Sequence, residues 1–91
     1  RSSAASDVYK RQIERLCRLP PPADFEWREL VSIMKGFDFE LHKNDGSRRH
    51  FVRQANGREY RFDCHEPHPS GIVKRYVIRN LKEFLEEQRL I

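Results

Sequence analysis

The spacing of apolar side chains along the chain predicts where helices and strands begin and end. Residues 24–35 place their apolar side chains on one helical face, at Trp27, Leu30, Val31 and Met34. This spacing predicts a helix over Asp24–Lys35, with Asp24 as its N-cap and Gly36 at its C-terminal end.

After Gly36 the helical period gives way to alternation. Apolar and polar residues alternate over residues 37–42, with apolar side chains at Phe37, Phe39 and Leu41. Such alternation predicts a half-buried strand. Residues 44–47, which read NDGS, predict a hairpin turn, and a second strand follows over Arg49–Arg53.

A second tight turn and a third strand complete the predicted sheet. Asn56 and Gly57 form a strong hairpin signal. Tyr60 and Phe62 then share one face of the third strand, because side chains two residues apart point the same way. Three strands joined by two tight turns form an antiparallel meander.

The C-terminal third predicts a loop and a closing helix. Two prolines interrupt Cys64–Gly71 and predict a loop. A helix follows over Lys74–Arg89, with an apolar stripe of Val77, Ile78, Leu81, Phe84 and Leu85. The predicted fold class is therefore α+β: a three-stranded antiparallel sheet with two helices on one face (α-β-β-β-α) and a short N-terminal extension.

The N-terminal segment differs from the rest of the chain. Arg1–Gln12 is similar to translated adaptor or cloning sequence, and we expect a non-native or disordered tail there. Residues 13–23 form an extension, in which Ile13–Leu19 allows a short helical segment and Pro20–Pro22 forms a stiff connector. Residues 24–91 are predicted to be the functional domain.

Composition and charge narrow the class of partner. Hydrophobic residues make up 37% and charged residues 35% of the chain, a balance typical of soluble globular domains. No apolar run approaches the roughly 20 residues of a membrane span, and no hydrophobic leader is visible. The net charge is +4, and residues 43–61, with six basic and two acidic residues, carry +4 by themselves. A local basic patch suits a polyanion such as RNA, although a solvated hairpin face explains the charge equally well.

Cysteine usage indicates the compartment. Cys17 and Cys64 lie far apart in the sequence and form no Cys-x-x-Cys pair. We therefore expect a reduced, cytoplasmic protein that does not associate with a membrane.

The ordered pieces of the chain resemble the HicA family of toxin ribonucleases, which has the layout of the double-stranded-RNA-binding domain. The matching pieces are WRELV at 27–31, GFDF at 36–39, Gly46-Ser47, Phe51, HEPHP at 65–69 and the closing helix with its Leu90-Ile91 end. The resemblance covers residues 26–91. It implies the toxin of a type II toxin–antitoxin system, a metal-independent endoribonuclease that cleaves mRNA and needs no cofactor. A HicB-like antitoxin is the implied partner, expected to cover the basic strand face and the loop at residues 65–68.

The resemblance also implies a catalytic histidine just after the first hairpin, in the pattern Gly-Ser-x-His. Residues 46–50 read GSRRH, so Arg49 holds that position and His50 follows it. With Phe51 in the core, His50 is expected on the open face of the sheet, unless a bulge shifts it. A histidine titrates near neutral pH, so His50 is the first candidate for proton transfer, and an ordinary strand histidine is the alternative. The residues expected to hold RNA phosphates on these strands are Ser47, Arg48, Arg49 and Arg53.

A second candidate site lies where the loop meets the last helix. His68 is predicted to supply a second proton-transfer group, and Lys74 and Arg75 to bind the RNA backbone at the helix N-terminus. Alternatively, His65 and the prolines only shape this corner of the fold.

The sequence leaves three further points: a possible metal site, the role of one aromatic residue, and an alternative function. A zinc site formed by Cys64, His65 and His68 lacks an obvious fourth ligand, so no metal is expected. Tyr76 lies near the loop and could stack on a base, but packing is the expected role. A non-catalytic RNA-binding module of the same fold is the alternative function, because the histidine is displaced from the family's position.

Overall fold

The computed structural model describes residues 3–43, 46–68 and 70–91, with the side chains of residues 3–9 left out. In chain order the elements are α1 (Ser3–Leu16), α2 (Trp27–Gly36), β1 (Glu40–Lys43), β2 (Arg48–Ala55), β3 (Arg58–His65) and α3 (Arg75–Glu87). The strands pair antiparallel in the order β1-β2-β3. The predicted fold class is confirmed.

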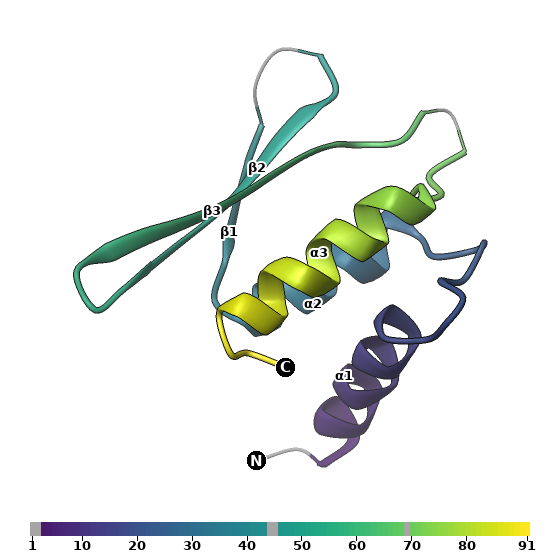
Figure 1. Ribbon diagram of the computed structural model, residues 1–91, viewed down its shortest axis with the longest axis horizontal. Coiled ribbons are helices and arrows are strands. Elements are labelled where there is room, and N and C mark those ends of the chain that lie inside the picture. The colour runs from purple at the N-terminus through teal and green to yellow at the C-terminus, as the bar shows by residue number, and fades with distance from the viewer. Residues whose placement is uncertain (1–2, 44–45, 69) are drawn as a thin grey trace.

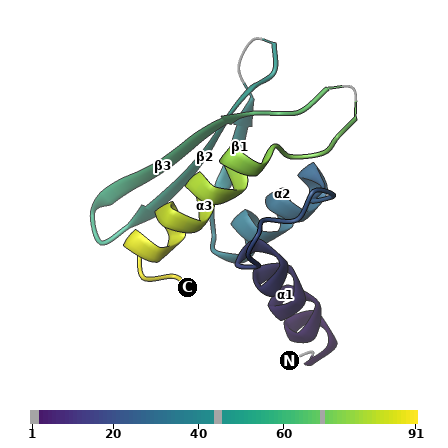
Figure 2. The same cartoon turned by 45° about the vertical axis from the view of Figure 1, so that its right-hand side comes forward.

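Helices α2 and α3 both lie on one side of the sheet, with α3 in front of α2 in the view of Figure 1. The core forms between these two layers, where the rings of Phe62 and Phe84 lie 5.3 Å apart and those of Trp27 and Phe51 5.8 Å apart. The most deeply buried side chains come from both layers and from α1: Leu16, Phe25, Leu30, Ile33, Met34, Phe51, Ile78, Leu81 and Leu85. In the view of Figure 1 the β2–β3 hairpin extends to the left beyond the helices, and in Figure 2 helix α1 lies on the opposite side of the molecule from this hairpin.

The start of α2 differs from the prediction. The helix begins at Trp27 with Glu26 as its N-cap, and the side chains of Glu26 and Glu29 form a reciprocal capping box. Asp24 is not the N-cap; its carboxylate pairs instead with Arg15 at 3.2 Å. The box satisfies free N–H groups of the first turn at Glu26, which fixes the helix start there.

The predicted end of α2 at Gly36 is confirmed, but the following strand starts later than predicted. Asp38 adopts the left-handed conformation, with φ of 69°, and the Phe39 N–H donates to the Met34 carbonyl at 2.9 Å. This closing turn uses Phe37 and Asp38, so β1 begins only at Glu40.

Of the two predicted hairpin turns, the structure describes one completely. Asn56 and Gly57 form the predicted turn, with φ of 54° and 73°, the left-handed pair that a two-residue hairpin requires. In the other hairpin, Asn44 and Asp45 lie outside the described residues. Strand β2 is longer than predicted, because its pairing with β3 continues to the Asn56-Gly57 turn.

Helix α1 is longer than the short segment predicted within Ile13–Leu19. Its last residue, Leu16, is 1% exposed and belongs to the main core. Arg15 links it to α2, with Nε donating to the Glu29 carboxylate at 2.8 Å. The proposed division of the chain at residues 12 and 23 stays a prediction. None of the helices in the described part of the chain has the length and apolar character needed to cross a bilayer.

Candidate functional site

The β2 register assigns each candidate residue to a face of the sheet. Phe51 is fully buried under the helices, so Arg49 points to the helix side and Arg48 and His50 to the other face. We call this uncovered side of the sheet the open face. The side chain of Arg49 therefore points to the opposite face of the sheet from those of Arg48 and His50.

The open face is not a basic surface. Cross-strand partners share a face, so the register places two arginines and three carboxylates there. These residues are Arg48 and Arg61 against Glu40, Glu59 and Asp63. The other cations of the basic segment lie on the helix side of the strands: Lys43, Arg49, Arg53 and Arg58. The expectation of one basic strand face is therefore wrong, because strand alternation divides the cations between two faces.

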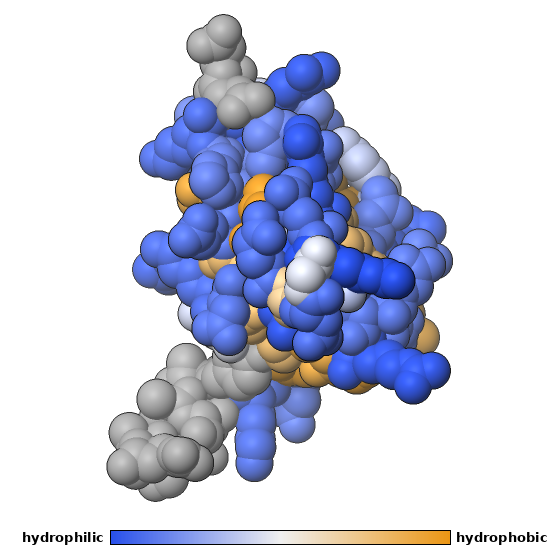
Figure 3. Space-filling model, turned by 90° about the vertical axis from the view of Figure 1, so that its left-hand side faces the viewer, coloured by the Kyte–Doolittle hydropathy of each residue, from blue (hydrophilic) through white to orange (hydrophobic). Residues whose placement is uncertain are grey.

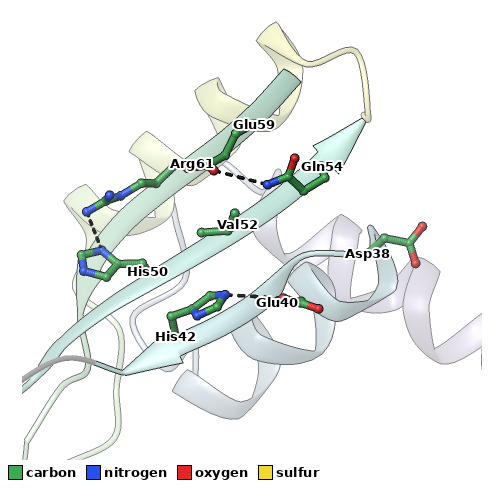
Figure 4. Close-up of a pocket in the computed structure, with 8 residues that line it drawn as sticks. All are labelled: Asp38, Glu40, His42, His50, Val52, Gln54, Glu59 and Arg61. Carbon is green, nitrogen blue, oxygen red and sulfur yellow. Dashed lines mark hydrogen bonds and ion pairs between the residues drawn. The ribbon is translucent and has the colours of Figure 1, made fainter. Parts of the chain in front are cut away.

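His50 lies in a polar cluster on the open face (Figure 4). Its Nδ1 is 2.8 Å from Oδ1 of Asp63 and 3.1 Å from Nη2 of Arg61. Arg61, by its hydrogen bond at 2.7 Å, and then His50 hold the pKa of Asp63 below its usual value. An ionised carboxylate beside an imidazole fixes the ring's orientation, so this pair has the arrangement of a histidine base with its orienting acid.

A second histidine lies next to His50 on the open face, on the neighbouring strand β1. His42 is the β1 partner of His50, and its Nε2 is 3.5 Å from Oε1 of Glu40. Both histidines line a broad hollow on the open face (Figure 4).

A different cavity lies at the corner between β2, the β3–α3 loop and the first turn of α3. We call it the loop pocket; its volume is about 420 Å³. Three of the predicted site residues, Ser47, His68 and Lys74, line it. Its other lining residues are His65, Glu66, Pro67, Ser70, Ile72, Tyr76 and Val77.

The loop is fixed to β2 by Arg49. The Arg49 Nε donates to Oε1 of Glu66 at 2.8 Å, and its Nη1 donates to the Gly46 carbonyl at 2.9 Å. The Glu66 N–H in turn donates to the Ser47 carbonyl at 2.8 Å. Arg49 is only 8% exposed, so its guanidinium is engaged within the protein.

The far end of the loop is fixed to the start of α2. The Trp27 N–H donates to the Gly71 carbonyl at 2.8 Å, and the Val73 N–H donates to the Phe25 carbonyl at 2.7 Å. These bonds hold Glu66 against Arg49 and Ser47 at one end of the loop, and Gly71 and Val73 against the start of α2 at the other end.

The first turn of α3 gives the pocket a positive end. Its N-cap is Lys74, which provides no side-chain capping bond, and the turn contains no acidic residue. A helix N-terminus carries partial positive charge and N–H groups suited to a phosphate. Lys74 adds a full charge at the pocket, whereas Arg75 is exposed beside it and does not line it.

The structure separates the predicted site residues into groups. Ser47, His68 and Lys74 share the loop pocket, whereas His50 lines a smaller cavity together with Arg48, Arg49, Arg61, Asp63, Cys64 and His65. The two candidate catalytic histidines therefore line different cavities. Arg53 lines neither of these two cavities, because it pairs with Tyr60 near the tip of the β2–β3 hairpin.

The hairpin end of the molecule is mostly hydrophilic, with only small apolar spots (Figure 3).

The sequence interpretation missed Asp63 as the partner of His50 and Glu66 as the partner of Arg49. The pairing of His50 with Asp63 could have been predicted from the sequence, since the Asn56-Gly57 turn sets the register of the two strands.

The described residues contain no group of three or more His, Cys, Asp or Glu side chains placed to hold a metal ion. Burial raises the pKa of the Cys64 thiol to about 12. A thiol with such a pKa stays protonated near neutral pH.

Three antiparallel strands between two amphipathic helices, with a pocket at the sheet-to-helix corner, define a small α-β-β-β-α domain. The model of the family described as "HicA toxin of bacterial toxin-antitoxin" matches residues 27–87. Because this match covers more than half of the 91 residues, the chain belongs to the HicA toxin family. Neither a curated protein nor a solved structure matches the chain significantly.

Proposed function

We propose that this protein is the toxin of a type II toxin–antitoxin system and cleaves mRNA as a metal-independent endoribonuclease, with the loop pocket as its active site. One observation carries the proposal: His68, Ser47 and Lys74 line a single pocket at the first turn of α3. The family's catalytic position is occupied by Arg49, whose guanidinium binds Glu66 in the wall of the same pocket.

The reaction uses the substrate's own nucleophile. The RNA 2′-oxygen loses its proton and forms a bond to the adjacent phosphorus, while the bond from phosphorus to the 5′-oxygen breaks and that oxygen gains a proton. The products are a 2′,3′-cyclic phosphate and a 5′-hydroxyl. We assign the protonation of the departing 5′-oxygen to the imidazole of His68, while a water molecule takes the proton of the 2′-hydroxyl and a proton from water restores the one that the ring gave up.

The remaining residues of the pocket bind the phosphate. Lys74 and the N–H groups at the start of α3 stabilise the negative charge that develops on its oxygens. The Ser47 hydroxyl donates a hydrogen bond to the same group. Arg48 and Arg75, both exposed, bind neighbouring phosphates of the strand. Arg49 acts through Glu66 by holding the loop, and is a positioning residue.

His50 is the other candidate for proton transfer, because Asp63 orients its ring. It faces the open side of the sheet, where carboxylates outnumber arginines, so a phosphate is attracted less strongly there than at the loop pocket. Arg53 is too close to the hairpin tip to share either site, and we propose for it only a contact with distant RNA phosphates.

The proposed biological setting follows from the family. The toxin would act in the cytoplasm, where mRNA is available. A HicB-like antitoxin would silence it by covering the loop pocket, the place where RNA must enter.

The test compares RNA cleavage by the wild type, His68→Ala and His50→Ala, with His42→Ala as the matched control on the open face. We expect the wild type to cleave an mRNA transcript in the presence of EDTA. Loss of the general acid–base group should slow His68→Ala by roughly 100- to 10,000-fold. The other two variants should stay close to the wild type. If His50→Ala alone is inactive, the active site is on the open face.

A non-catalytic RNA-binding module is the second candidate function, favoured by the engagement of Arg49 with Glu66 at the family's histidine position. In that case the wild type binds RNA in a salt-dependent way and leaves it intact. Arg49→His, which restores the family's Gly-Ser-x-His pattern, would then introduce cleavage that the wild type lacks.

A further inference from the structure

Tyr76 is an exposed aromatic residue at the start of α3. Its side chain is 54% exposed, whereas the next two residues of the helix, Val77 and Ile78, are buried. The expectation that Tyr76 packs into the protein is therefore wrong. No ring contact or side-chain hydrogen bond joins Tyr76 to any residue that the structure describes.

Tyr76 belongs to the wall of the loop pocket. Pro67 and Ile72 add further apolar surface there, while His68 and Lys74 contribute polar groups. One pocket thus combines apolar and aromatic surface with cationic and proton-transferring groups. A nucleotide is complementary to this surface, because it joins a flat base to an anionic phosphate.

We propose that Tyr76 is a stacking platform for one unpaired nucleobase, next to the phosphate held at Lys74. Aromatic side chains bind splayed-out bases of single-stranded RNA by stacking on their faces. A base inside a duplex is already stacked on both faces, so this site selects single-stranded RNA. The inference rests on the proposed function for its substrate class and adds a base subsite to it.

The experiment measures binding separately from cleavage. The probe is a 2′-O-methyl RNA oligonucleotide, which has no free 2′-hydroxyl and cannot be cleaved. It carries a single 2-aminopurine, whose fluorescence is quenched by stacking, and a matched probe has an abasic nucleotide at that position. The proteins are the wild type, Tyr76→Phe, Tyr76→Ala and Leu19→Ala, the last being an exposed apolar control outside the pocket.

We expect the wild type, Tyr76→Phe and Leu19→Ala to bind the base-containing probe roughly 5- to 100-fold more tightly than the abasic probe. Tyr76→Ala should bind both probes equally and lose the fluorescence quenching. The proposal is overturned if Tyr76→Ala keeps the preference, or if the wild type has none.

The two proposals fail in different ways. A wild type that cleaves RNA but shows no base preference refutes the stacking site alone. A wild type with a Tyr76-dependent preference but no cleavage supports the stacking site and refutes the ribonuclease.

Discussion

The guanidinium of Arg49 and the carboxylate of Glu66 join the second strand to the loop that carries His68, at 2.8 Å between Nε and Oε1. Both side chains are largely buried, with 10% and 26% exposure. The pair occupies the position at which the family pattern has histidine. Arg49, which stands where the family pattern has histidine, therefore helps to hold the loop that forms the loop pocket.

Removing the carboxylate from this pair should destabilise the fold. Glu66→Ala leaves the Arg49 charge buried without its acceptor, and we expect the free energy of unfolding to fall by about 1.5–3 kcal/mol, measured by urea denaturation. Glu59→Ala is the control, since Glu59 is exposed and its loss should change stability by less than about 0.5 kcal/mol. Equal effects of the two substitutions would show that the Arg49–Glu66 pair contributes nothing specific.

Glu29 should be important for the start of α2. Its carboxylate accepts the Glu26 N–H at 2.9 Å and the Arg15 Nε–H at 2.8 Å. Glu29→Ala loses both bonds and should lower stability by about 1–2 kcal/mol. Glu29→Gln keeps an acceptor for the backbone and should lose less. Thermal unfolding followed by circular dichroism checks the order, and a Gln variant as unstable as the Ala variant would contradict the capping role.

The turn between β2 and β3 depends on the freedom of Gly57 to adopt positive φ. No heavy atom lies within 4 Å of a Cβ added there, so the effect of a substitution comes from the backbone conformation alone. Gly57→Ala should destabilise the fold by about 1–2 kcal/mol, and Gly57→Asn by less, because asparagine tolerates the left-handed region. Urea denaturation of the two variants measures the difference. An alanine variant as stable as the wild type would show that the turn relaxes to another type.

Asp63 should make a small contribution to stability that depends on pH. Arg61 and His50 lower its folded-state pKa, so the contribution is complete above the unfolded value near 3.8 and is lost as pH falls through the lower folded value. The carboxylate is 56% exposed, so solvent screening keeps the effect below about 1 kcal/mol. Wild type and Asp63→Asn should differ at neutral pH and converge in acid, when unfolding is measured at a series of pH values. A difference that persists below both pKa values would have another origin.

Lys74 should contribute one phosphate contact. Binding of uncleavable RNA to Lys74→Ala should be weaker, and the slope of log K against log salt should fall by about 0.7 for a single strand. Lys35→Ala, which removes an exposed lysine from α2, is the matched control and should leave the slope unchanged. If both variants reduce the slope equally, the effect reflects net charge rather than a contact at the pocket.

The sequence determined the three strands, the helices α2 and α3 and their order, because each of these elements depends on local signals. The apolar stripe of α3 and the Asn56-Gly57 turn are examples, and both appear where the residue pattern predicts them. The sequence analysis did not identify Glu26 as the N-cap of α2, because Asp24, a plausible N-cap residue, lies only two residues before it. Asp24 was the better residue type, but it pairs with Arg15, a contact that depends on α1.

Only the tertiary structure decided which residues share a site. Strand alternation predicted that His50 and Arg49 face opposite sides, but not that Glu66 engages Arg49. Nor did the sequence show that the loop brings His68 to Lys74, since this depends on hydrogen bonds between segments far apart in the chain. Local patterns fix a side chain's direction within its own element, whereas a pocket is formed by elements whose relative positions follow from the packing of the whole core.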